Sequence, residues 1–93
     1  MYNVPQFQFI HFLSRKMTES DVKTKIEAGM DCHSVTVAGD GYHFEATVVS
    51  EAFEGKRPVA RQQMVYATVQ EEIASGDLHA ISLKTLTPAE AGL

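Results

Sequence analysis

The chain has 93 residues, which is the size of one small domain. Hydrophobic residues make up 44% and charged residues 22%, a balance typical of a folded globular domain and not of a disordered chain. Twelve acidic against eight basic residues give a net charge of −4, which argues against a strong nonspecific nucleic-acid binder. The single cysteine excludes an intramolecular disulfide and an all-cysteine metal site within one chain.

Residues 1–16 differ in composition from the rest of the chain. They contain three of the five phenylalanines, and the apolar run is followed by Arg15, Lys16 and Met17. A secretory signal carries its positive charge before the apolar run, so the order predicts a cytoplasmic protein, with no membrane attachment because every apolar run is short. Two interpretations remain open: an N-terminal extension, of the kind that is often poorly ordered, before a domain of residues 17–93, or a strand or tail that covers apolar surface. The helix start after Met17 favours the extension.

The first predicted helix covers residues 19–29. Thr18 or Ser20 can cap its N-terminus, and Gly29 is a candidate for its C-terminal cap. Apolar residues recur at four-residue spacing and predict one buried stripe, formed by Val22, Ile26 and Met30.

A β-hairpin follows. Alternating residues predict strands over 32–38 and 42–50, and the turn between them is Gly39-Asp40-Gly41, which suits the positive φ values of tight hairpin turns. Phe53 is the one large apolar residue of the next loop and is expected to anchor it.

A long helix is predicted over 58–75, from Pro58 at its first position to Gly76 at its end. Helical spacing places the following residues on one, mostly apolar, face: Val59, Gln62, Val65, Tyr66, Val69 and Ile73. A third strand is predicted over 78–84, and Thr87-Pro88 suggests a short terminal helix. The order α-β-β-α-β-(α) predicts an α+β fold. A right-handed crossover makes the second and third strands parallel, in a three-stranded mixed sheet with both helices on one face.

His79, His43 and Cys32 are the candidate chemical residues. His79 lies early in the third strand and His43 at the start of the second, so the predicted sheet places both at one edge. Cys32 begins the antiparallel first strand and is expected at the opposite end. Each residue also has a structural interpretation: a packed strand-edge histidine, a solvated turn histidine and an inert core cysteine. No catalytic triad or phosphate-binding loop is visible, so the sequence predicts no enzyme.

A second candidate is a small basic cluster before and within the long helix. Lys56 and Arg57 precede the helix N-terminus, and Arg61 follows one turn later. Together they could meet phosphate groups, although a solvated turn explains them equally well. With a net charge of −4, such a cluster predicts only weak, salt-sensitive contact with DNA.

Two separated motifs resemble those of BolA-like proteins: VVSEAFEGK at residues 48–56 and HAISLKTLTP at residues 79–88. The segments AGDGYHF at 38–44 and QQMVY at 62–66 resemble the small bacterial subgroup of acid-stress BolA homologues. The resemblance covers about residues 19–90 and implies a class II KH-like fold, in agreement with the predicted elements.

The resemblance also implies a role in iron–sulfur trafficking or sensing. BolA-like proteins share a [2Fe-2S] cluster with a monothiol glutaredoxin, which supplies its cysteine thiolate and the thiol of a bound glutathione. The BolA-like partner supplies the motif histidine, here His79, and a second ligand best matched here by His43, with Cys32 a weaker candidate. Without its partner the chain is expected to hold no cluster and to be a monomer or a weak homodimer.

The alternative that the resemblance implies is a DNA-binding transcriptional regulator of stress or morphology genes. Here the sequence departs from KH domains, which clamp nucleic acid with a Gly-x-x-Gly loop. The corresponding segment is Gly55-Lys56-Arg57-Pro58, with one glycine and a proline that lacks an amide donor. This departure and the acidic net charge favour the cluster-sharing adaptor.

Overall fold

A computed structural model describes residues 17–93. Residues 1–16, and with them the two interpretations of that segment, lie outside the described part of the chain. The elements in order are α2 (Glu19–Gly29), β1 (Ser34–Gly39), β2 (His43–Val49), the 3₁₀ helix η1 (Glu51–Phe53), α3 (Pro58–Thr68), α4 (Gln70–Ser75) and β3 (Ala80–Leu86). None of the helices within 17–93 has the length and apolar character needed to span a bilayer.

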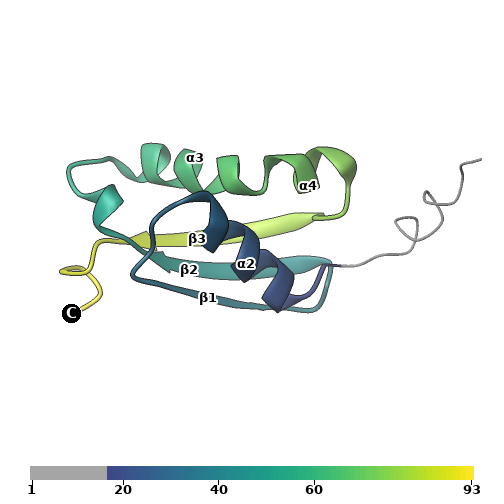
Figure 1. Cartoon of the computed structure of the whole chain (residues 1–93), viewed down its shortest axis with the longest axis horizontal. Coiled ribbons are helices and arrows are strands. Elements are labelled where there is room, and N and C mark those ends of the chain that lie inside the picture. Colours follow the sequence, from purple (N-terminus) through teal and green to yellow (C-terminus); the bar gives the residue numbers. More distant parts are fainter. Residues whose placement is uncertain (1–16) are drawn as a thin grey trace, which may run out of the picture.

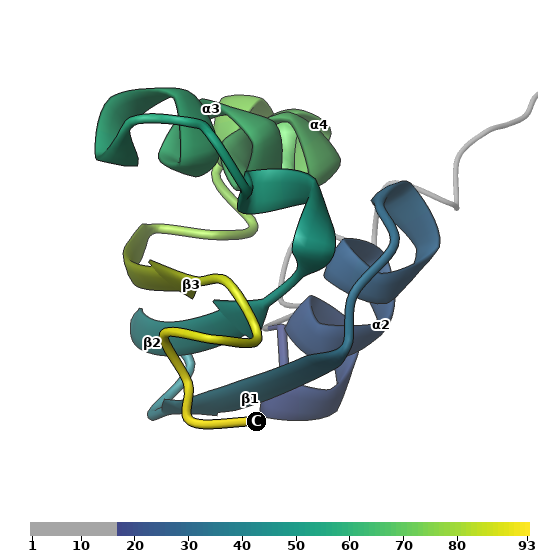
Figure 2. The same cartoon turned by 90° about the vertical axis from the view of Figure 1, so that its left-hand side faces the viewer.

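The predicted α+β architecture is confirmed. The sheet order is β1-β2-β3, with β1 and β2 antiparallel and β2 and β3 parallel. The helices lie on one face of this mixed sheet, and in the described part of the chain the other face is uncovered (Figures 1 and 2). The core lies between the two layers and includes Ile26 of α2, Phe44 and Val48 of β2, and Val65 of α3.

Helix α2 begins as predicted. The Thr18 hydroxyl accepts a hydrogen bond from the amide of Asp21, and the Asp21 carboxylate accepts one from the amide of Thr18, which completes a capping box. The prediction that Gly29 caps the C-terminus is wrong, because Gly29 is the last helical residue and Met30 caps the helix in an extended conformation. Glycine is needed here because α2 meets α3: a Cβ at this position would lie 2.6 Å from Thr68 Cγ2.

The predicted β-hairpin is confirmed. The Asp40 carboxylate accepts hydrogen bonds from the amides of Tyr42 (2.9 Å) and His43 (3.0 Å), and Gly41 adopts a φ of 98°. This turn therefore fixes the backbone at the start of β2. Along β2 the predicted alternation holds, and the core face consists of Phe44, Ala46 and Val48, all buried.

The predicted long helix is interrupted at Val69, which divides it into α3 and α4. Val69 has φ −120° and ψ 18°, and the Thr68 hydroxyl donates a 2.6 Å hydrogen bond to the carbonyl of Val65, a contact that bends helices. Val65 and Val69 are buried as predicted. The expected apolar face does not continue, since Val59 is 68% and Ile73 41% exposed.

The connections around the long helical segment are set by local contacts. Phe53 is fully buried, which confirms its predicted role as the anchor of its loop. Gly76 ends α4 with a φ of 88°, as predicted. The expected terminal helix is a single turn, in which Thr87 and Glu90 exchange backbone-to-side-chain hydrogen bonds.

Candidate functional site

His43 and His79 lie at the same end of the sheet. The parallel register pairs His43, the first residue of β2, with Ala80, the first residue of β3. His79 comes immediately before Ala80, because β3 begins two residues later than predicted. Both histidines are exposed. The expectation that the topology places them at one edge is confirmed, although nothing in their sequence spacing requires it.

Two neighbours hold His43. Its amide is fixed by Asp40 in the hairpin turn, and its ring Nε2 lies 3.2 Å from Ser82 Oγ on β3. The amides of His43 and Tyr42 donate to the Asp40 carboxylate and lower the pKa of that carboxyl below its usual value. Ser82 was not singled out in the sequence. It can be identified from the register of β2 and β3: Ala80 pairs with His43, and Ser82, two residues further along β3, lies on the same face of the sheet as His43.

His79 has an aromatic neighbour. Its ring centroid lies 5.5 Å from that of Tyr42, with an angle of 40° between the two planes. Tyr42 is 54% exposed, so the ring pair lies at the surface and can be reached by a second protein. This end of the sheet thus carries two imidazoles, one from the first residue of β2 and one from the residue before β3. A neutral imidazole is a good ligand for iron or zinc.

Cys32 lies at the opposite end of the sheet, as predicted. Val49, the last residue of β2, pairs with Ser34, two residues after Cys32. The thiol is half-buried and donates a 3.5 Å hydrogen bond to the carbonyl of Met30. Burial, with the nearby carboxylates of Glu27 and Asp31, raises the pKa of the Cys32 thiol. Because the thiolate is the form that binds metals, this environment disfavours Cys32 as a ligand.

The described residues do not form a complete metal site. Within 17–93, no group of three or more histidine, cysteine, aspartate and glutamate side chains is arranged to hold a metal ion. His43 and His79 provide two donor side chains, whereas an iron–sulfur cluster takes four. A cluster at this end of the sheet would therefore need ligands beyond those that residues 17–93 provide.

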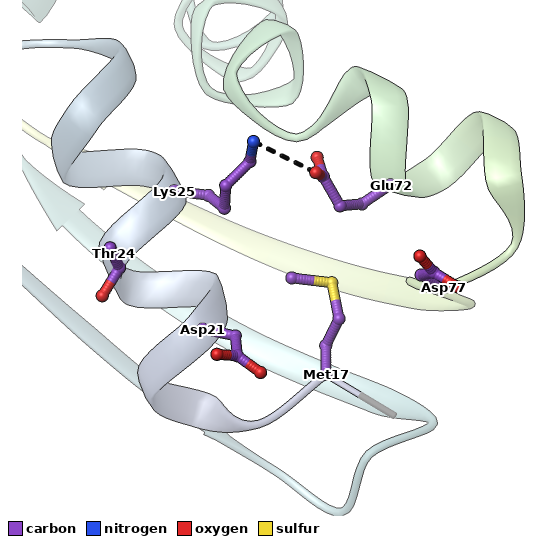
Figure 3. Close-up of a pocket in the computed structure, with 6 residues that line it drawn as sticks. All are labelled: Met17, Asp21, Thr24, Lys25, Glu72 and Asp77. Atoms are coloured by element: carbon purple, nitrogen blue, oxygen red, sulfur yellow. Dashed lines mark ion pairs between the residues drawn. The ribbon is translucent and has the colours of Figure 1, made fainter. Parts of the chain in front are cut away.

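A separate pocket of about 260 Å³ lies between α2 and α4 (Figure 3). It is lined by Met17, Asp21, Thr24, Lys25, Glu72 and Asp77. Lys25 reaches across from α2 and forms a 3.1 Å ion pair with Glu72 of α4. Asp21 belongs to the capping box of α2. The ion pair joins the two helices and the capping box holds the start of α2, so Lys25, Glu72 and Asp21 have a structural explanation.

The three residues of the predicted basic cluster, Lys56, Arg57 and Arg61, have different surroundings in the structure. Lys56 and Arg57 are exposed at the N-terminus of α3. Arg61 instead forms a two-pronged contact with Glu90, at 2.7 and 3.4 Å, and donates to the carbonyl of Lys56. Hydrogen bonds from Arg61 and from the amide of Thr87 lower the pKa of the Glu90 carboxyl. Arg61 thus ties the C-terminal turn to α3, and the exposed basic surface is smaller than the sequence predicted.

Together these features define a small α+β protein with a mixed three-stranded sheet and two exposed histidines at one end of it. The family model described as BolA-like protein matches residues 13–90, and the chain belongs to this family. This confirms the resemblance found in the two sequence motifs.

Known relatives agree with this assignment. The acid stress protein IbaG of Escherichia coli (strain K12) is 38% identical over 74 residues, which cover 80% of this chain and 88% of that protein. The DNA-binding transcriptional regulator BolA of Vibrio cholerae is 45% identical over 60 residues, covering 64% of this chain and 55% of that protein. The structure of a bolA protein homologue from Coxiella burnetii superposes with a TM-score of 0.73 at 40% identity, covering 83% and 99% of the two chains.

Proposed function

We propose that this protein is a non-enzymatic adaptor that shares a [2Fe-2S] cluster with a monothiol glutaredoxin in the cytoplasm, for trafficking or sensing of the cluster. The observation that carries the proposal is the parallel register of β2 and β3, which brings two exposed histidines to one end of the sheet. Family membership supports it, because the resemblance assigns a cluster ligand to the position of His79.

In this proposal His79 is the essential ligand and His43 the second. The remaining ligands come from the partner: the glutaredoxin thiolate and the thiol of its bound glutathione. Histidine in place of a thiolate makes a cluster less negative and raises its reduction potential. The ligand count supports the need for a partner, since residues 17–93 offer two donors at this end of the sheet and a cluster takes four.

The test is reconstitution with a monothiol glutaredoxin, glutathione, iron and sulfide, followed by visible absorption and circular dichroism. We expect a [2Fe-2S] spectrum from the mixture that the chain alone does not produce. His79→Ala should abolish it or change its shape, and His43→Ala should weaken it. Cys32→Ser and His33→Ala, both at the other end of the sheet, are the matched controls and should leave it unchanged. Loss of the spectrum in Cys32→Ser together with a normal spectrum in His79→Ala would contradict the ligand assignment.

The second candidate function is transcription regulation by direct DNA contact. Two observations favour it: the exposed Lys56 and Arg57 at the N-terminus of α3, and the similarity to a Vibrio cholerae protein named as a DNA-binding regulator. Arg61 is the third residue of this candidate surface, but its guanidinium forms an ion pair with Glu90, which makes it less available to a phosphate. A surface of two or three cations predicts weak binding.

DNA binding is measured as affinity against salt concentration. Each phosphate contact contributes a slope of about −0.9 in a plot of log K against log salt, so about −2 to −3 is expected in total. Sub-micromolar, sequence-specific binding at physiological salt that survives charge reversal of Lys56 and Arg57 would refute the expectation of weak contact.

A further inference from the structure

His43 has a hydrogen-bonding side chain next to its ring. Ser82 Oγ lies 3.2 Å from Nε2 of His43. The two residues are 39 positions apart in the sequence and meet because β2 and β3 run in parallel. The Asp40 carboxylate holds the backbone amide of the same residue at 3.0 Å. His43 is therefore fixed both at its backbone and at one of its two ring nitrogens.

The direction of this hydrogen bond determines which ring nitrogen of His43 keeps a lone pair that could bind a metal. A neutral imidazole carries a proton on one ring nitrogen and a lone pair on the other. Histidines that bind metals almost always donate the second ring N–H to an oxygen, which sets the tautomer and the orientation of the ring. When Nε2–H donates to Ser82 Oγ, the lone pair of His43 lies on Nδ1.

We propose that Ser82 is a positioning residue that holds His43 in the Nε2–H tautomer, so that His43 coordinates through Nδ1. The inference rests on the proposed function, since it concerns the same histidine pair. It makes His43 a pre-oriented ligand although the ring lies at an exposed edge. A bond in the other direction, from the Ser82 hydroxyl to Nε2, would place the proton on Nδ1 and leave that nitrogen without a lone pair.

The first measurement uses the full chain without metal. Two-bond proton–nitrogen NMR spectra of histidine-labelled protein report which ring nitrogen of His43 carries the proton. We expect the Nε2–H form in the wild type, with ring nitrogen shifts that move in Ser82→Ala and return toward wild type in Ser82→Thr, which keeps the hydroxyl. Ser34→Ala is the matched control, because it removes a serine hydroxyl at the other end of the same sheet.

The second measurement uses the reconstituted complex with glutaredoxin. Loss of a partner that orients a metal ligand typically costs about 10–100-fold in metal affinity. We expect Ser82→Ala to weaken cluster retention on that scale, Ser82→Thr to restore it, and Ser34→Ala to leave it unchanged. If the wild-type mixture forms no cluster, the proposed function fails, while the NMR result still reports on Ser82 and His43. An Nδ1–H tautomer in the wild type, or a Ser82→Ala variant that matches Ser34→Ala in both measurements, would overturn the inference.

Discussion

Replacing Phe53 with alanine should strongly destabilise the fold. The side chain is fully buried, lies in the main core cluster and anchors the loop between β2 and α3. Truncation of a buried phenylalanine costs about 3–5 kcal/mol in the free energy of unfolding. A domain of 93 residues has a total stability of about 5–14 kcal/mol, so the variant loses a large share of it. Arg61, whose guanidinium lies 6.0 Å from the ring centroid, also loses a packing neighbour.

The assay is urea unfolding followed by far-ultraviolet circular dichroism. With an m value of about 1–2 kcal/mol/M, the midpoint should fall by at least about 1.5 M. Phe53→Leu keeps most of the apolar volume and should lose less, and Val59→Ala, at a position 68% exposed, is the control that should change little. An unchanged midpoint for Phe53→Ala would refute the anchoring argument. Molecules of this variant that remain folded should still form the cluster with glutaredoxin, because Phe53 is not among the proposed ligands.

Three further predictions concern the remaining fold. Gly29→Ala should lower the free energy of unfolding, measured by thermal unfolding, by about 1–3 kcal/mol, because the new Cβ would overlap Thr68 of α3. An unchanged stability would show that α2 and α3 can move apart at this contact without cost. Since folding lowers the pKa of the Asp40 carboxyl, its stabilising effect is present above the unfolded value of about 3.9 and is lost as the pH falls through the folded value. The stability of the wild type relative to Asp40→Asn should therefore shrink below about pH 4, and a gap independent of pH would contradict this. Deletion of residues 1–16 should leave the fold intact, and a loss above about 2 kcal/mol would show that this segment belongs to the core.

Local chemistry explains why most elements could be predicted from the sequence. The capping box at Thr18 and the alternation along β2 each involve residues only a few positions apart. The same is true of the turn at Asp40 and of the glycine end of α4 at Gly76. The end of the sheet that carries His43 and His79 could also be predicted, because a strand–helix–strand connection makes β2 and β3 parallel and so brings their first residues to the same end.

The remaining features depend on residues that are far apart in the sequence. The structural role of Gly29 was predicted wrongly because glycine is required there by the close approach of Thr68 on α3. The residues around Gly29 in the sequence do not reveal that contact. The break at Val69 replaces one predicted helix with two, and Ile73, which the predicted helical spacing placed with Val65 and Val69, is 41% exposed. Periodicity assumes an unbroken helix and cannot show where the chain bends.

The family, the order of the elements and the end of the sheet at which the histidines lie could all be predicted from the residues alone. How the individual side chains are used depends on contacts between elements that are far apart in the chain. The sequence placed Arg61 in a candidate nucleic-acid surface, whereas in the structure its guanidinium pairs with Glu90, 29 residues away. Ser82 gained a place in the site only through its contact with His43 across the parallel strands. Hydrogen bonds of this kind follow from the register and the packing of whole elements, and a one-dimensional pattern contains neither.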